Sequence, residues 1–101
     1  MRSVDKARDY KKDFQRESAG RYRIVLTDEL PDVIALLAND LPLPKRYYDH
    51  ELIGCWAGHR DCHIRSDLLL IYMKIGDAKS TEESSGVLRL VRLGSHSELF
   101  G

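Results

Sequence analysis

The feature that most constrains the fold is an uninterrupted apolar run in the second half of the chain, residues 68–73. It is far shorter than the ~20 residues that a membrane-spanning helix needs. Extended to Ile75, the segment contains one charged residue, Lys74, and does not otherwise alternate with polar residues. That pattern is typical of a strand buried on both faces. The sequence therefore predicts a central β-strand over residues 68–75.

Two further segments of the second half have strand patterns. Residues 58–64 alternate between the two faces, and residues 87–93 are rich in Val and Leu. Residues 65–67, Arg-Ser-Asp, have the composition of a hairpin turn that joins the first of these strands to the central one. Residues 76–86 are polar, acidic and bounded by glycines, which indicates a long loop. Residues 1–7 form a weaker pattern, that of a short edge strand.

The first half of the chain has helical patterns. Tyr10 and Phe14 lie one helical turn apart among charged residues, which predicts a surface helix over residues 8–18. A second helix follows, either N-capped by Thr27 or with Pro31 in its first turn. Its broad apolar stripe consists of Leu30, Val33, Ile34, Leu36, Leu37 and Leu41.

Helices followed by strands predict the α+β class, with helices packed on one face of a mostly antiparallel sheet. A chain of 101 residues is the size of one domain, and 43% apolar residues are enough for one core. We therefore expect a single domain over residues 1–101.

Charge and cysteine usage limit the partners and the compartment. Sixteen basic and sixteen acidic residues give a formal net charge of zero, which removes the simplest argument for a nucleic-acid binder. Residues 1–25 nevertheless carry eight basic and four acidic side chains, so a local field for an anionic ligand is possible, although a solvated helix face explains them as well. The N-terminal residues have no apolar stretch typical of a signal peptide, and Cys55 and Cys62 have no zinc-site spacing. Reduced thiols and a cytoplasmic location, without membrane association, are expected.

The four histidines gather around the predicted sheet. Because side chains alternate along a strand, His59, Asp61 and His63 should point to one side. His50 precedes the sheet and His96 follows its last strand. Each residue alone has an ordinary structural explanation, but polar groups concentrated on one face favour a site over a core. Imidazoles exchange protons near neutral pH, and carboxylates orient them.

A metal site is the main rival interpretation. His59, Asp61 and His63 with a further histidine could form a set of two histidines and one carboxylate. At a rise of ~3.3 Å per residue, however, such a strand spreads its groups over ~13 Å, too far for one ion. We therefore expect no metal and no cofactor.

Several motifs of the second half resemble the YafQ-type toxins of the RelE/ParE superfamily of bacterial toxin–antitoxin modules. These motifs are Leu41-Pro42-Leu43-Pro44, Tyr48-Asp49-His50, Leu52-x-Gly54-x-Trp56-x-Gly58-x-Arg60-Asp61-x-His63 and Arg92-x-Gly94-Ser95-His96-Ser97-Glu98-Leu99-Phe100-Gly101. The resemblance covers residues 41–101 apart from the acidic loop. It implies two N-terminal helices packed on a curved, mostly antiparallel sheet, with a C-terminal tail beside the active cleft.

The resemblance also implies an activity, partners and site residues. The activity is that of the toxin of a type II module, a ribosome-dependent endoribonuclease that cuts mRNA in the A site. The implied partners are a cognate antitoxin, the ribosome and mRNA, with operator DNA bound only through the antitoxin complex. The family's catalytic positions correspond to His50, Asp61, His63, Asp67 and His96. Arg92 stands where a basic residue meets the scissile phosphate, and Phe100 where a ring can stack on a base, unless it only fills the core. Cys55, His59 and the long acidic loop depart from the family pattern.

The mechanism that suits these groups needs no metal. The mRNA 2′-OH attacks the adjacent phosphorus and leaves a 2′,3′-cyclic phosphate, with His50 as the base and His96 as the acid. The alternative is a ParE-like toxin that inhibits a protein such as DNA gyrase without catalysis, or an inactive relative that binds only an antitoxin. Neither alternative needs the histidine–aspartate set, which therefore favours the nuclease.

Overall fold

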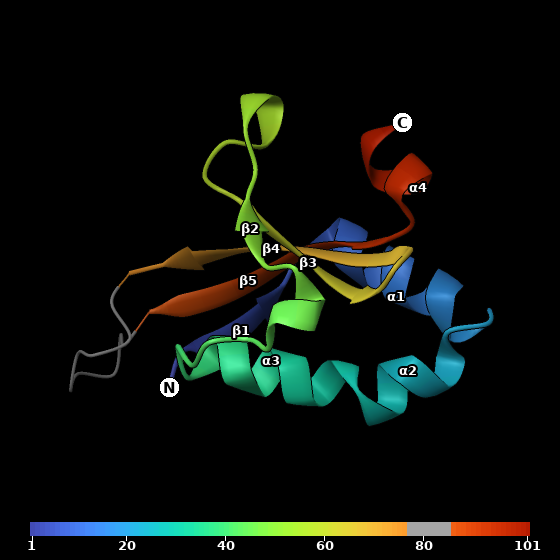
Figure 1. Ribbon diagram of the computed structural model, residues 1–101, viewed down its shortest axis with the longest axis horizontal. Helices are drawn as coiled ribbons and strands as arrows, with labels where there is room; N and C mark the ends of the chain where they lie inside the picture. The colour runs from blue at the N-terminus through green and yellow to red at the C-terminus, as the bar shows by residue number, and fades with distance from the viewer. Residues whose placement is uncertain (77–85) are drawn as a thin grey trace.

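The computed structural model describes residues 1–76 and 86–101, which form a five-stranded sheet with helices (Figure 1). The strand order is β1-β5-β4-β3-β2. The pair β1–β5 is parallel and the other three pairs are antiparallel. The strands are β1 (Ser3–Lys6), β2 (His50–Glu51), β3 (Arg60–Arg65), β4 (Leu68–Ile75) and β5 (Val87–Gly94). The predicted α+β class, the N-terminal edge strand and the central position of residues 68–75 are confirmed. Most of the predicted acidic loop, residues 77–85, lies outside the described residues.

The central strand β4 is buried on both faces because two separate clusters cover it. Leu68, Leu70 and Tyr72 pack in the main core with the N-terminal helices. Leu69 and Ile71 point the other way and pack with Leu99 near the C-terminus. These five residues, the first five of the eight in β4, are at most 1% exposed, as the apolar run predicts.

The described residues form four α-helices, α1 (Arg8–Ser18), α2 (Arg23–Asp28), α3 (Leu30–Ala38) and α4 (His96–Phe100), and two 3-10 helices, η1 (Lys45–Tyr47) and η2 (Gly54–Trp56). In Figure 1, α2 and α3 run in line beneath the sheet. The short α4 and the segment 50–58 stand on the opposite side. The sequence predicted N-terminal helices packed on the sheet and a C-terminal tail, and it did not predict that residues 96–100 form a helix. The buried residue Leu99 of α4 belongs to the smaller cluster on the other face of β4.

The predicted second helix is two helices. Pro31 lies in the first turn of α3, as one alternative expected, and residues 23–28 form the separate helix α2. Thr27 is inside α2, where its hydroxyl donates to the carbonyl oxygen of Ile24 at 3.0 Å, so it caps no helix. Leu41 lies beyond the end of α3 and is exposed. A six-residue helix shows too few turns for its periodicity to be recognised in the sequence.

Candidate active site

Strand pairing brings His50, Asp61 and His63 together. His50 of β2 is directly opposite Asp61 of β3, and His63 lies two residues further along the same face of β3. One carboxylate oxygen of Asp61, Oδ2, is 3.8 Å from Nε2 of His50 and 3.8 Å from Nε2 of His63. The two imidazoles therefore flank a single carboxylate, as the alternation of the sequence predicted for Asp61 and His63.

The Asp61 carboxylate is buried with few partners. The residue is 2% exposed, and among the described residues its Oδ1 atom has no hydrogen-bond partner. Burial raises the pKa of Asp61, and the charges of His63, His50 and His96 oppose this without reversing it. A buried carboxylate that lacks full hydrogen bonding is unfavourable for stability and is typical of functional sites.

Tyr48 is the residue of this cluster that the sequence reasoning did not include among its site residues. Its backbone carbonyl oxygen lies 2.8 Å from Nδ1 of His50. Its ring lies 4.4 Å from the His50 ring and 5.3 Å, edge-on, from the His63 ring. The available signal was its place in the Tyr48-Asp49-His50 motif, directly before a candidate catalytic residue.

Asp67 and His96 meet at the start of α4. Asp67 Oδ1 accepts a hydrogen bond from the backbone N–H of His96 at 3.0 Å. Ser95 caps the helix and forms a reciprocal capping box with Glu98, so His96 begins a helix and not a simple turn. The His96 ring centroid is 6.4 Å from that of His63. The five predicted catalytic residues, which come from three separate segments, therefore lie in one cluster.

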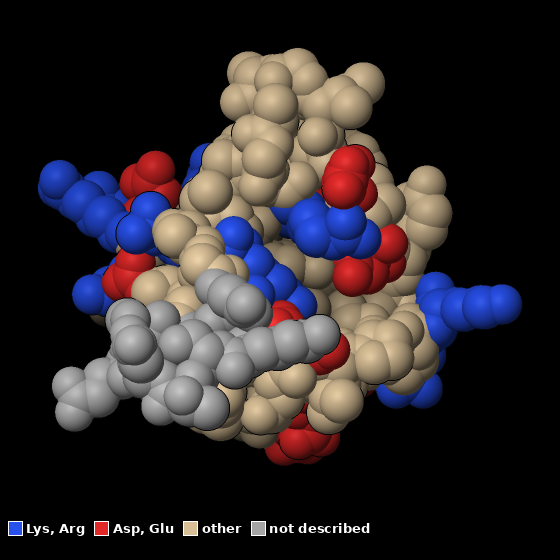
Figure 2. Space-filling model, turned by 90° about the vertical axis from the view of Figure 1, so that its left-hand side faces the viewer, with Lys and Arg blue, Asp and Glu red and all other residues tan. Residues whose placement is uncertain are grey.

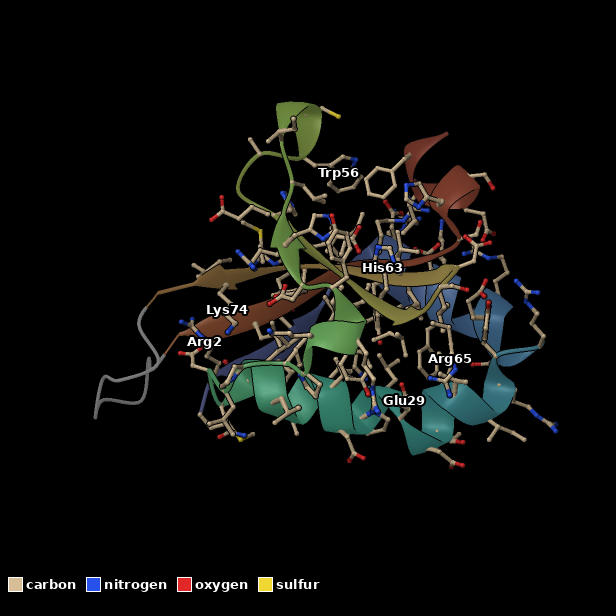
Figure 3. All side chains as sticks on the ribbon, viewed as in Figure 1. Arg2, Glu29, Trp56, His63, Arg65 and Lys74 are labelled. Atoms are coloured by element: carbon tan, nitrogen blue, oxygen red, sulfur yellow. The ribbon has the colours of Figure 1, made fainter. Side chains whose placement is uncertain are left out.

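Aromatic rings extend the cluster beyond His96. The Phe100 ring lies 5.3 Å from His96 and 6.3 Å from Trp56. Phe100 is 36% exposed, whereas the neighbouring Leu99 is buried, so Leu99 and not Phe100 fills the core. Figure 3 shows Trp56 and His63 on the side of the sheet away from α3.

His59 does not join the Asp61 cluster. Strand β3 begins only at Arg60, and the His59 ring contacts Trp56, edge-on at 5.3 Å. Over residues 1–76 and 86–101, no three or more His, Cys, Asp or Glu side chains are grouped as metal ligands. The two cysteines differ: Cys62 is buried, as expected of a small apolar residue, but Cys55 is exposed.

Arg92 lies in a different set of contacts from the histidines. Its Nε donates to Oδ2 of Asp13 on α1 at 2.7 Å. Asp13 also accepts from the backbone N–H of Leu93 at 3.0 Å and from Arg16 at 3.0 Å. Burial raises the pKa of Asp13, but these hydrogen bonds and the two guanidinium charges outweigh it and hold the pKa below its usual value. In the sheet register Arg92 pairs with Ile71, which itself pairs with Asp61. The expected contact of Arg92 with a phosphate remains a prediction.

The charged side chains are distributed in mixed patches. In the view of Figure 2, Lys and Arg residues are interspersed with Asp and Glu residues below an uncharged projection. Residues 52–58, which project in Figure 1, contain no charged side chain. This arrangement agrees with the zero net charge and gives no continuous basic stripe on that face.

Residues 2–101 match the family described as "Bacterial toxin of type II toxin-antitoxin system, YafQ". The chain belongs to the YafQ family. The resemblance noted in residues 41–101 is thereby confirmed and extends over the N-terminal helices.

Individual relatives agree with this assignment. The mRNA interferase toxin YafQ of Escherichia coli K12 is 46% identical over 66 residues, which are 65% of this chain and 62% of the relative. The chain matches about three fifths of the length of its curated relatives. The YafQ chain in the E. coli DinJ–YafQ complex superposes with a TM-score of 0.77 at 31% identity, covering 100% of both chains. A metal-bound toxin from Helicobacter pylori superposes with a TM-score of 0.73 at 33% identity, covering 99% of this chain and 100% of the other.

The helices of the described residues are short. None of them is long and apolar enough to cross a membrane.

Proposed function

We propose that this protein is a ribosome-dependent endoribonuclease that cuts mRNA in the A site by acid–base catalysis without a metal. The observation that carries the proposal is the gathering of His50, His63 and His96 around the buried carboxylate of Asp61. The curated name of the E. coli relative, an mRNA interferase, supports the reaction class. Paired proton donors and acceptors are what phosphodiester transfer to a neighbouring hydroxyl requires.

His50 is suited to be the general base. A carbonyl oxygen only accepts hydrogen bonds, so the contact with Tyr48 assigns the N–H to Nδ1 of neutral His50 and leaves Nε2 to take a proton. Nε2 removes the proton of the 2′-OH as this oxygen attacks the phosphorus. The imidazolium that forms has its charge next to Asp61, 3.8 Å away. Burial keeps water from weakening this attraction.

His96 is suited to be the general acid. It donates a proton to the O5′ leaving group as the P–O5′ bond breaks, which yields a 2′,3′-cyclic phosphate and a 5′-OH end. The side chain is exposed at the start of α4, and Asp67 holds the backbone of this residue. Exposure allows the ring to regain a proton from solvent between turnovers.

The remaining site residues act on charge and on substrate position. His63, between His50 and His96, and Arg92 would offset negative charge on the phosphoryl oxygens. Arg92 would have to share its guanidinium between the phosphate and Asp13, and its side chain is 25% exposed. Phe100 offers a ring on which a base can stack.

The partners follow from the same proposal. The protein binds a cognate antitoxin, as YafQ of E. coli does in its complex with DinJ. Operator DNA is contacted only through the antitoxin complex. The substrate is mRNA on the ribosome, so the protein acts in the cytoplasm.

The direct test is primer extension on a translated message, with and without ribosomes. New 5′ ends inside the reading frame that require both the protein and ribosomes are expected. Growth arrest without any cut message would contradict the nuclease and favour a ParE-like toxin. If the protein causes neither growth arrest nor cleavage, it is a relative that only binds its antitoxin.

A further inference from the structure

The exposed aromatic side chains of this protein lie at the histidines. Among the Phe, Trp and Tyr side chains of the described residues, the exposed ones are Tyr48, at 62%, and Phe100, at 36%. Tyr48 contacts His50, and Phe100 contacts His96. The ring centroids of His50 and His63 are 6.0 Å apart, and His63 lies 6.4 Å from His96. The two exposed rings therefore flank the two ends of a row of three imidazoles.

The backbone of Tyr48 holds its ring in this position. Its φ of 48° and ψ of 50° are left-handed, a conformation that bulky side chains adopt rarely. The Tyr48 N–H donates to the carbonyl oxygen of Lys45 at 3.0 Å, and its own carbonyl contacts His50. Core packing does not explain the side chain, because most of its surface is exposed. Unfavourable conformations of this kind are concentrated at ligand-binding positions.

We propose that Tyr48 binds substrate by stacking on the base of the nucleoside that carries the attacking 2′-OH. This inference rests on the proposed nuclease function. A 2′-OH that gives its proton to His50 places its own sugar and base on the His50 side of the site, where Tyr48 stands. The leaving O5′, which His96 protonates, belongs to the next nucleoside, on the side of Phe100. The RNA therefore crosses the site in one direction, with its 5′ base on Tyr48 and its 3′ base on Phe100.

Two variants separate the ring of Tyr48 from its backbone and its hydroxyl. Tyr48→Asn removes the ring, and Asn tolerates the left-handed conformation. Tyr48→Phe keeps the ring and removes only the hydroxyl. Both variants leave the backbone carbonyl next to His50, so the pH dependence of cleavage should not move. Melting temperatures of both variants give the control for folding.

The experiment measures kcat/KM for cleavage of ribosome-bound messages that are intact or carry one abasic nucleotide at the cut site. Tyr48→Asn should slow cleavage of the intact message by about 5- to 150-fold, the range that one base–aromatic stack is worth, while Tyr48→Phe stays near wild type. With the 5′ base missing, wild type and Tyr48→Asn should cut at similar rates. With the 3′ base missing, the full difference between them should remain.

The outcomes distinguish this inference from the nuclease proposal. If wild type cuts no message, both fail. If wild type cuts, but Tyr48→Asn cuts the intact message equally fast, the stacking proposal alone is overturned. It is also overturned if Tyr48→Asn is slower by the same factor on all messages, because the ring would then only position His50.

Discussion

Two buried aspartates of this small protein have opposite surroundings. Asp13 is 3% exposed and Asp61 is 2% exposed. Asp13 accepts hydrogen bonds from Arg92, Arg16 and the Leu93 N–H, and its pKa is lowered. Asp61 has two imidazoles at 3.8 Å and one oxygen without a described partner, and burial raises its pKa.

The difference indicates what each carboxylate does. Asp13 joins α1 to the free edge of β5 beyond the end of β1, because it bonds the Leu93 N–H while Arg16 bonds the Leu93 carbonyl oxygen at 3.0 Å. That is a structural role, which protects an exposed strand edge. Within the described part of the chain, Asp61 lacks comparable hydrogen bonds and ion pairs to guanidinium groups, which is expected of a carboxylate that is retained for chemistry at the expense of stability.

The largest effect is expected from His96→Ala, on the rate of cleavage. If His96 is the general acid, its loss should slow cleavage by about 10²–10⁴-fold. The side chain is exposed at the first position of α4, so the free energy of unfolding should change by less than about 0.5 kcal/mol. Cleavage of a translated message and thermal melting measure the two effects. A folded variant that binds antitoxin and still cuts at the wild-type rate would remove His96 from the mechanism.

The next effect is expected from Asp13→Asn, on stability. Removing one partner of a buried ion pair is worth about 3–5 kcal/mol in comparable cases, and here Arg92 and Arg16 both lose their carboxylate. In urea unfolding, the free energy of unfolding of Asp13→Asn should be lower than that of wild type by about 3 kcal/mol. The comparison variant is Asp9→Asn, an exposed position one turn earlier in the same helix, which should change the free energy of unfolding by less than about 1 kcal/mol. Equal effects of the two substitutions would contradict the structural role of Asp13.

A smaller effect is expected in the pH dependence of stability. Because the pKa of Asp13 is lowered by folding, its contribution is present above the unfolded pKa of about 4 and is lost as pH falls through the folded value. Because folding raises the pKa of Asp61, the protonated Asp61 carboxyl group favours the folded state. This contribution to stability is lost as pH rises above the unfolded pKa of about 4 and through the folded value. The free energies of unfolding of Asp13→Asn and wild type should therefore become equal in acid. The free energy of unfolding of Asp61→Asn should increase relative to that of wild type as pH rises. Parallel pH profiles for both variants would show that the two carboxylates do not differ.

No effect is expected from metal removal at the protein itself. The His59 ring contacts Trp56, whereas the His63 ring lies beside Asp61, so the two imidazoles are not arranged to share one ion. Metal analysis of the purified protein is the appropriate measurement, because ribosomes themselves need Mg²⁺. Stoichiometric zinc, copper or iron that is lost in His63→Ala would contradict the metal-free mechanism.

Sequence patterns predicted most of the sheet but not the long-range partners. The run over residues 68–75 and the alternation around Asp61 and His63 are local signals, and the structure bears both out. The Asp13–Arg92 pair joins residues 79 positions apart, a distance at which periodicity carries no information. The strand start at Arg60 separated His59 from Asp61, which alternation alone did not indicate. Tyr48 was missed because its left-handed backbone and exposure are properties of the fold.

Whether Asp61 is retained for catalysis and not for stability can be decided by measuring urea unfolding and cleavage kinetics of Asp61→Asn at neutral pH, with Asp13→Asn as the comparison. The free energy of unfolding of Asp61→Asn should equal or exceed that of wild type, because a buried charge is removed. Cleavage by the folded variant should slow by about tenfold or more, because the carboxylate 3.8 Å from His50 no longer stabilises the imidazolium that forms in the transition state, and a loss of about 1.4 kcal/mol is a factor of ten in rate. A loss of stability equal to that of Asp13→Asn, or an unchanged cleavage rate, would contradict the catalytic role of Asp61.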